Sequence, residues 1–186
     1  QRQGAGQQVA LGHRNRAPVI DLVGRGATDA GNVTALVQSS DIVFLCVTGT
    51  PEVEDLVHRP GGILDACREG QIVIDTSTSQ PASTLRMKDA FAAKGVRFID
   101  SPLTRTPVEA EQGRLNTLVG ADDATFAEIE PVLRGFCENV FHIGAVGSAQ
   151  ALPMTIGYFA EHAAVATGLV VWSVAGGLVF VASRKL

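Results

Sequence analysis

Two polar loops, each following a short apolar run, contain the residues best suited to chemistry. The run Ile72–Ile74 leads into the hydroxyl-rich loop Asp75–Ser79, and Val96–Ile99 leads into Asp100–Thr106. Ligands of doubly wound α/β folds bind at the carboxyl ends of parallel strands, so we expect both loops at one site. A hydroxyl-rich turn before a helix is also a common helix cap, so the first loop alone is a weak signal.

Arg105 gives the second loop a permanent positive charge. A guanidinium presents a planar fork of hydrogen-bond donors that suits a carboxylate, a sulfonate or a phosphate. We therefore interpret Arg105 as a candidate for binding an anionic ligand. The alternative is a surface arginine that binds no ligand.

Short apolar runs alternate with amphipathic segments along the chain, which is the pattern of βαβ units around a parallel sheet. The stretch Asp41–Val47 is of strand length and almost entirely apolar, as expected for a strand buried on both faces. Asn32 is a candidate helix cap, and Pro51 and Pro81 stand where helices can begin. The sequence therefore predicts an α/β fold with a doubly wound parallel sheet. Further strands are expected at 9–11, 72–74, 96–99, 115–119 and 140–143, and further helices from Pro18 and at 122–133.

Four motifs occur in a fixed order along the chain: Asp75-Thr76-Ser77-Thr78-Ser79-Gln80-Pro81, Phe98 to Thr106, Gly113-Arg114-Leu115, and His142 to Gly147. Their order and spacing resemble the β-hydroxyacid dehydrogenases, which include 3-hydroxyisobutyrate dehydrogenase, tartronate semialdehyde reductase and, more distantly, 6-phosphogluconate dehydrogenase. The resemblance covers roughly residues 6 to 160. It implies a Rossmann-like nucleotide-binding domain over residues 1–150 and an NAD(P)-dependent oxidoreductase acting on a small anionic 3-hydroxyacid or semialdehyde.

The resemblance also implies roles for particular residues. Ser77 and Thr78 would lie beside the nicotinamide ring, Ser77 on the substrate side and Thr78 on the cofactor side, and Val47 and Thr48 would line the cofactor. Most family members have Ser-Gly-Gly where this chain has Thr104-Arg105-Thr106, and this loop would bind the substrate's anionic group. The Arg-Thr pair is similar to that of sulfolactaldehyde reductase.

Arg14 is the candidate for choosing between NADP and NAD. Folds that select NAD place an acidic residue after the second strand, whereas an arginine accommodates the 2′-phosphate of NADP. The turn after Val9–Leu11 contains Arg14 and Arg16 and no acid. We therefore expect NADP as the cofactor, with NAD as the alternative. A solvated basic turn without a ligand is the other interpretation.

The chain departs from the family at the residue that moves the proton. The resemblance implies a lysine eleven residues after His142 and an asparagine one helical turn later, but the chain has Pro153 and Gly157. Proline has no titratable group, so no catalytic residue is intact. An incomplete dehydrogenase and a non-catalytic nucleotide- or partner-binding domain both fit this loss, as does a sequencing error or a degraded gene.

The two ends of the chain also depart from the family. A dinucleotide-binding fold needs a strand, a glycine-rich turn and a helix in that order, but Gly4-Ala5-Gly6 precedes the strand Val9–Leu11. We therefore expect the first strand to be missing. Residues 151–186 form a separate apolar segment, in which Ala163 to Ala182 carries no charge over twenty residues. It is interpreted as the start of a buried interdomain helix or a frameshifted end, with a membrane span as the alternative.

Composition narrows the partners that can be expected. The net charge of −4 argues against nucleic-acid binding, because no basic stripe is available to neutralise phosphates. The three cysteines are far apart and have no metal-ligand spacing, so we expect buried thiols, no metal site and a reducing, cytoplasmic location. The resemblance implies a homo-oligomer formed through an all-α domain, and we expect that domain to be absent from this sequence.

Overall fold

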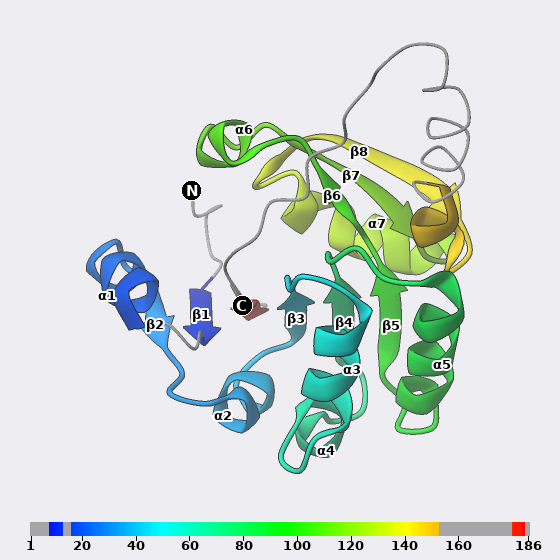
Figure 1. Ribbon diagram of the computed structural model, residues 1–186, viewed down its shortest axis with the longest axis horizontal. Helices are drawn as coiled ribbons and strands as arrows, with labels where there is room; N and C mark the ends of the chain where they lie inside the picture. The colour runs from blue at the N-terminus through cyan, green and yellow to red at the C-terminus, as the bar shows by residue number, and fades with distance from the viewer. Residues whose placement is uncertain (1–7, 13–15, 153–179, 185–186) are drawn as a thin grey trace.

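The computed structural model describes residues 8–12, 16–152 and 180–184 of the chain, and it contains one sheet with helices on both faces (Figure 1). The strands are β1 (Gln8–Gly12), β2 (Thr28–Asp29), β3 (Ile42–Leu45), β4 (Ile72–Asp75), β5 (Arg97–Asp100), β6 (Leu103–Thr104), β7 (Leu115–Gly120), β8 (Cys137–Gly144) and β9 (Phe180–Arg184). The helices are α1 (Arg16–Gly24), α2 (Val33–Gln38), α3 (Thr50–His58), α4 (Ile63–Ala66), α5 (Pro81–Ala92), α6 (Pro107–Glu111) and α7 (Asp123–Leu133). A further helical stretch is described over residues 148–152.

The sheet has the strand order β2-β1-β9-β3-β4-β5-β7-β6, and β8 pairs with β7. Strand β4 pairs in parallel with β3 on one side and with β5 on the other, and β1 pairs in parallel with β2. Beyond β5 the direction changes, because β7 pairs with β5 in antiparallel fashion through Asp100 and Gly120. The predicted α/β class is confirmed. The parallel arrangement holds for β3, β4 and β5, the part of the sheet that carries the Asp75–Ser79 loop. The antiparallel pairings of β9 with β1 and β3, and of β7 with β5 and β6, make the sheet mixed.

Alternating side chains of the central strands pack against different layers of helices. Val43 and Leu45 of β3 belong to the cluster that includes side chains of α2, α3, α4 and α5. Ile42 and Phe44 of the same strand belong to a second cluster that includes Ile129 of α7. Successive residues of a strand point to opposite faces, so this division means that helices cover both faces of the sheet. The prediction of a strand buried on both faces is confirmed for this strand.

Local capping signals place the helix ends close to where the sequence predicts them. The side chain of Asn32 accepts a hydrogen bond from the N–H of Ala35 at 2.8 Å, which satisfies one free donor at the start of α2. Pro51 and Pro81 each stand in the first turn of a helix, α3 and α5. These short-range signals fix the lengths of the connections and therefore the positions of the loops at the sheet edge.

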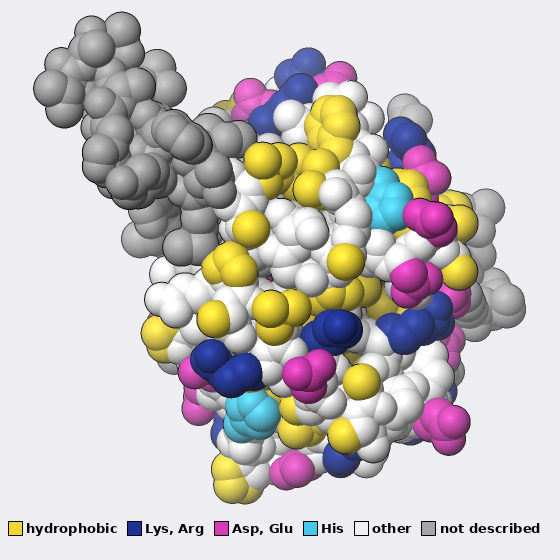
Figure 2. All heavy atoms as spheres, turned by 90° about the vertical axis from the view of Figure 1, so that its right-hand side faces the viewer, with side chains coloured by type: hydrophobic (Ala, Val, Ile, Leu, Met, Phe, Trp, Pro, Cys, Tyr) yellow, Lys and Arg dark blue, Asp and Glu magenta, His cyan; other side chains and the backbone are white. Residues whose placement is uncertain are grey.

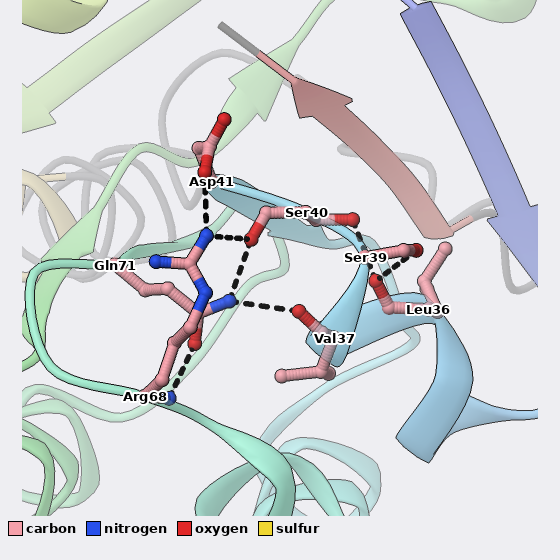
Figure 3. A network of polar contacts seen from close by, with 7 residues as sticks. All are labelled: Leu36, Val37, Ser39, Ser40, Asp41, Arg68 and Gln71. Carbon is pink, nitrogen blue, oxygen red and sulfur yellow. Dashed lines mark hydrogen bonds and ion pairs between the residues drawn. The ribbon is translucent and has the colours of Figure 1, made fainter.

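A network of hydrogen bonds and an ion pair connects the segments at the amino ends of β3 and β4 (Figure 3). The Gln71 side-chain amide donates hydrogen bonds to the carbonyl oxygens of Val37 at 2.7 Å and Ser40 at 2.6 Å. Its oxygen accepts the N–H of Arg68 at 2.7 Å, and the Arg68 guanidinium lies 2.5 Å from a carboxylate oxygen of Asp41. The network ties α2 to the start of β4. It lies at the opposite end of these strands from the loops selected by the sequence analysis.

Strand β9 lies between β1 and β3, near the C label in Figure 1, and runs antiparallel to both. Val181 stands opposite Leu11 on one side and Phe44 on the other. The sequence predicted a helix or a membrane segment through residue 182, so the strand at residues 180–182 differs from that expectation. Residues 153–179 lie outside the described part, and the assignment of 151–186 as a separate segment therefore stays a prediction. Among the described residues, no helix is both long enough and apolar enough for a membrane span.

The cysteines are less uniformly buried than the sequence analysis expected. Cys137 is buried, whereas Cys46 and Cys67 are half-buried, and all three are free thiols. Burial raises the pKa of the Cys137 thiol to about 12, so this group is a thiol and not a thiolate at neutral pH. Burial also raises the pKa of Cys46. These thiols are therefore poor nucleophiles.

Charges of both signs are mixed on the surface. On the face drawn in Figure 2, Lys and Arg side chains are interspersed with Asp and Glu side chains. Several ion pairs join charges four positions apart along the chain, as between Arg134 and Glu130 at 2.7 Å. This face offers no broad field of one sign. The expectation that the protein does not bind nucleic acid stays a prediction.

Candidate functional site

The loops that follow β3 and β4 lie side by side at the carboxyl edge of the sheet. The N–H of Val47 donates a hydrogen bond to the Ser77 hydroxyl at 2.9 Å, and the N–H of Thr76 donates to the Leu45 carbonyl at 2.8 Å. A β-carbon added to Gly49 would lie 3.4 Å from the carbonyl oxygen of Thr78. The structure therefore brings together the predicted residues Val47, Thr48, Ser77 and Thr78.

These four residues differ in what they expose. Val47 and Ser77 are buried, whereas Thr48 and Thr78 are exposed at the edge. Because the Ser77 hydroxyl accepts the Val47 N–H, it holds the two loops together. The side chains that a ligand at this edge can reach directly are those of Thr48 and Thr78.

Asp75 fixes the shape of the hydroxyl-rich loop from inside. One carboxylate oxygen accepts the N–H of Ser77 at 2.9 Å, and the other accepts the Ser79 hydroxyl at 2.7 Å. The side chain is fully buried, and this burial raises the pKa of its carboxyl group. The sequence predicted no separate role for Asp75. An acid at the end of the apolar run Ile72–Ile74 was the available signal.

A second buried carboxylate, Asp100, binds the segment that leads to the helical stretch 148–152. It accepts the N–H of Gly147 at 2.7 Å and the N–H of Gln150 at 2.8 Å. Burial raises the pKa of Asp100, and the nearby charge of Asp75 adds to this in the same direction. A β-carbon at Gly120 would lie 2.2 Å from an Asp100 oxygen, so only glycine fits beside this carboxylate.

Gln150 joins this segment to the Asp75–Ser79 loop. Its side-chain nitrogen donates to the Ser77 carbonyl at 2.7 Å, and its side-chain oxygen accepts the Ser79 N–H at 3.0 Å. The side chain is 1% exposed. No motif in the sequence predicted a role for this residue. A single amide among Ala149, Ala151 and Leu152 was the only signal.

The predicted substrate loop lies on the surface next to β7 and β8. Thr104, Arg105 and Thr106 are all exposed, and Arg105 donates to the Arg114 carbonyl at 2.7 Å and pairs with the carboxylate of Glu138. Thr106 caps α6. The guanidinium therefore already has an anionic partner from β8, which the sequence analysis did not foresee.

Arg105 also adopts an unusual backbone conformation, with φ of 84°. A positive φ is uncommon for a residue with a β-carbon, and glycine adopts it without steric cost. The family pattern expects glycine at this position. The loop therefore has the backbone conformation that glycine adopts easily, although the residue at this position in this chain is an arginine.

Some of the predicted site falls outside the described residues. Arg14, Pro153, Gly157 and the segment Gly4–Gly6 belong to this group. The helical stretch 148–152 ends one residue before position 153, where the family resemblance implies a lysine. The described residues contain no cluster of His, Cys, Asp and Glu side chains suited to a metal ion.

Comparisons with known proteins agree with this geometry. Residues 2–144 match the family model described as the NAD-binding domain of 6-phosphogluconate dehydrogenase. The 2-(hydroxymethyl)glutarate dehydrogenase of Eubacterium barkeri is 35% identical over 73% of this chain and 45% of its own length. The 3-hydroxyisobutyrate dehydrogenase of Pseudomonas aeruginosa is 30% identical over 78% of this chain and 49% of its own length.

Solved structures share the fold. A structure described as Psf3 in complex with NADP+ and 2-OPP has a TM-score of 0.72 and 28% identity, covering 84% of this chain and 59% of that one. A 3-hydroxyisobutyrate dehydrogenase from Salmonella typhimurium has a TM-score of 0.69 and 22% identity, covering 82% of this chain and 57% of that one.

Fold and site together define a Rossmann-like domain whose loops meet at the carboxyl edge of the sheet. The chain belongs to the family of the NAD-binding domain of 6-phosphogluconate dehydrogenase. It spans about half the length of the curated relatives that it matches. The predicted resemblance to NAD(P)-dependent hydroxyacid dehydrogenases is therefore confirmed at the level of the family.

Proposed function

We propose that this chain is the nucleotide-binding part of an NAD(P)-dependent oxidoreductase of the 3-hydroxyacid dehydrogenase type. The observation that carries the proposal is the contact between Val47 and Ser77, which joins two loops at the edge where such folds bind ligands. The exposed side chains of Thr48 and Thr78 lie on these loops and would contact the dinucleotide. The substrate would be a small anionic 3-hydroxyacid or semialdehyde.

NADP is the proposed nucleotide, with NAD as the alternative. Arg14 would pair with the 2′-phosphate. The solved structure of Psf3, to which the chain is similar, is described as a complex with NADP+. A cytoplasmic location, expected from the cysteines, and a homo-oligomer, expected from the family, remain predictions.

Titration with the nucleotides tests this proposal. We expect NADP(H) to bind more tightly than NAD(H), and Arg14→Ala to weaken NADP(H) binding by roughly tenfold to a hundredfold, because a charge-assisted hydrogen bond contributes about 1.5–3 kcal/mol. Binding of NAD(H) is expected to change little. Arg25→Ala is the control, because Arg25 is an exposed arginine paired with Asp21 at 3.4 Å. An equal or stronger preference of the wild-type chain for NAD(H) contradicts the proposal.

Arg105 is proposed to bind the anionic group of the substrate. For this, its ion pair with Glu138 would break and the substrate's anionic group would replace the Glu138 carboxylate. We expect Glu138→Gln to strengthen the binding of sulfonate, phosphate or carboxylate analogues, because the guanidinium loses its competing partner. Arg105→Gly is expected to weaken the same binding by roughly tenfold to a hundredfold. Competition titrations in the presence of NADP(H) measure both effects, with Arg134→Ala as the control. Unchanged binding in both variants would identify Arg105 as a structural residue that only ties its loop to β8.

The second candidate function is a non-catalytic nucleotide- or partner-binding domain. The identity of Pro153, where the family has its proton-transfer lysine, favours it. A nucleotide-binding domain of either kind uses the same site, so nucleotide titration does not separate the two candidates. Turnover by the double variant Pro153→Lys with Gly157→Asn does, because only an incomplete dehydrogenase is expected to gain activity from it.

A further inference from the structure

Gln150 contacts both peptide groups that flank Thr78. The Ser77 carbonyl belongs to the peptide before Thr78, and it accepts from the Gln150 side-chain nitrogen at 2.7 Å. The Ser79 N–H belongs to the peptide after Thr78, and it donates to the Gln150 side-chain oxygen at 3.0 Å. A single amide therefore fixes the peptide planes on both sides of Thr78, which sets the two backbone dihedral angles of that residue.

We propose that Gln150 is a positioning residue that holds Thr78 in the orientation needed for dinucleotide binding and couples it to the helical stretch 148–152. The inference rests on the proposed function of the Thr48 and Thr78 edge. Gln150 itself is 1% exposed and does not contact the ligand. It acts through Thr78, which is exposed at the edge.

The coupling continues through the backbone of Gln150. Its N–H donates to Asp100 at 2.8 Å, and Asp100 opens the loop that contains Arg105. One residue thus connects the proposed cofactor loop, the start of the proposed substrate loop, and the helical stretch that leads to position 153. A shift of any one of these segments changes the hydrogen bonds of the others.

An uncharged amide is the side chain that this position requires. It must donate to one peptide and accept from the other, and a carboxylate has no proton to donate. Two titratable side chains, those of Asp75 and Asp100, lie close to the Gln150 side chain or backbone. Asp75 binds the same Ser77–Ser79 loop, and Asp100 accepts the N–H of Gln150. An ionised glutamate at position 150 would add a third buried carboxylate to this group, whereas a protonated glutamate has both the donor and the acceptor that the two peptides need.

The test measures NADP(H) affinity for the full chain and for variants at two buried glutamines. Gln71 is the matched control, because it is also 1% exposed and binds backbone groups, but at the amino ends of the strands. We expect Gln150→Ala to weaken NADP(H) binding about tenfold, which equals about 1.4 kcal/mol. Gln71→Ala is expected to lower the melting temperature about as much as Gln150→Ala does, while leaving the NADP(H) affinity within about twofold of wild type.

The Gln150→Glu variant supplies a second measurement, the pH dependence of NADP(H) affinity, which a purely structural role of Gln150 would not change. Its NADP(H) affinity is expected to be low at neutral pH and to approach that of the wild-type chain as the pH falls to about 5, since burial favours the protonated carboxyl. Circular dichroism at each pH identifies the folded samples. If wild type binds no NADP(H), the proposed function fails. If wild type binds and Gln150→Ala binds equally well, or Gln71→Ala weakens binding as much, the inference fails.

Discussion

Oxidation of 3-hydroxyisobutyrate, glycerate or sulfolactate by this chain with NADP is expected to be at least about a hundredfold slower than oxidation by a family member that has the lysine. General acid–base catalysis contributes about a hundredfold to ten-thousandfold, and Pro153 has no group that can take or give a proton. The 3-hydroxyisobutyrate dehydrogenase of Pseudomonas aeruginosa, which is 30% identical, is a suitable reference. Absorbance of the reduced nicotinamide measures the rate.

The double variant Pro153→Lys with Gly157→Asn separates the missing proton carrier from other causes of low activity. Its turnover is expected to exceed that of the wild-type chain, whereas Lys88→Arg, a change at a lysine outside the motif, is expected to have no effect. Wild-type turnover comparable to the reference enzyme would contradict the assignment of position 153. If the double variant shows no gain in turnover, the low rate has a cause other than Pro153.

Removal of the Asp100 carboxylate is expected to destabilise the fold strongly. The Asp100→Ala variant leaves the N–H groups of Gly147 and Gln150 buried without an acceptor. Each unsatisfied buried donor costs about 1–3 kcal/mol, so we expect the loss of both acceptors to lower the free energy of unfolding by about 2–6 kcal/mol. Urea denaturation measures the change. The control Asp89→Ala removes an exposed carboxylate of α5 and is expected to change stability by less than about 0.5 kcal/mol.

The pH dependence of stability provides a second test of Asp100. Burial raises the pKa of the folded carboxyl above its ordinary value of 3.8, so the folded state keeps this proton to a higher pH than the unfolded state does. The stability that this group contributes is complete below pH 3.8 and is lost as the pH rises through the folded pKa. Asp100→Asn is expected to remove that decline. A variant with the same pH profile as wild type, or an Asp100→Ala loss below about 1 kcal/mol, would mean that the carboxylate contributes little.

The features that sequence reasoning predicted depend on short-range signals. Asn32 caps α2 through a residue three positions along the chain, and the strand at Ile72–Ile74 follows from its own apolar residues. The loops after β4 and β5 could be placed together because parallel strands end at one edge, whereas Val47 and Thr48, after β3, were predicted from the family resemblance. Arg105 was identified as a charged group, but not its partner Glu138.

The missed features depend on contacts between distant residues. Gln150 and Ser77 are 73 positions apart, and Arg105 and Glu138 are 33 positions apart. No periodicity or local motif marks such pairs, because each partner alone is an ordinary polar residue. The strand β9 was missed for a related reason. Its first residues, 180–182, belong to the uncharged run that begins at Ala163, and apolar length alone does not separate a buried strand from a helix.

The position of β9 has a consequence for the order in which the chain folds. Residues 180–184 fill the gap between β1 and β3, so pairing in this part of the sheet joins residues about as far apart as the chain allows. Contacts of such high sequence separation slow folding, because the intervening chain loses conformational entropy before they form. During synthesis, both flanking strands leave the ribosome long before β9 does. Until it arrives, β1 and β3 present open edges on which another chain can pair, so the nascent protein is prone to aggregate.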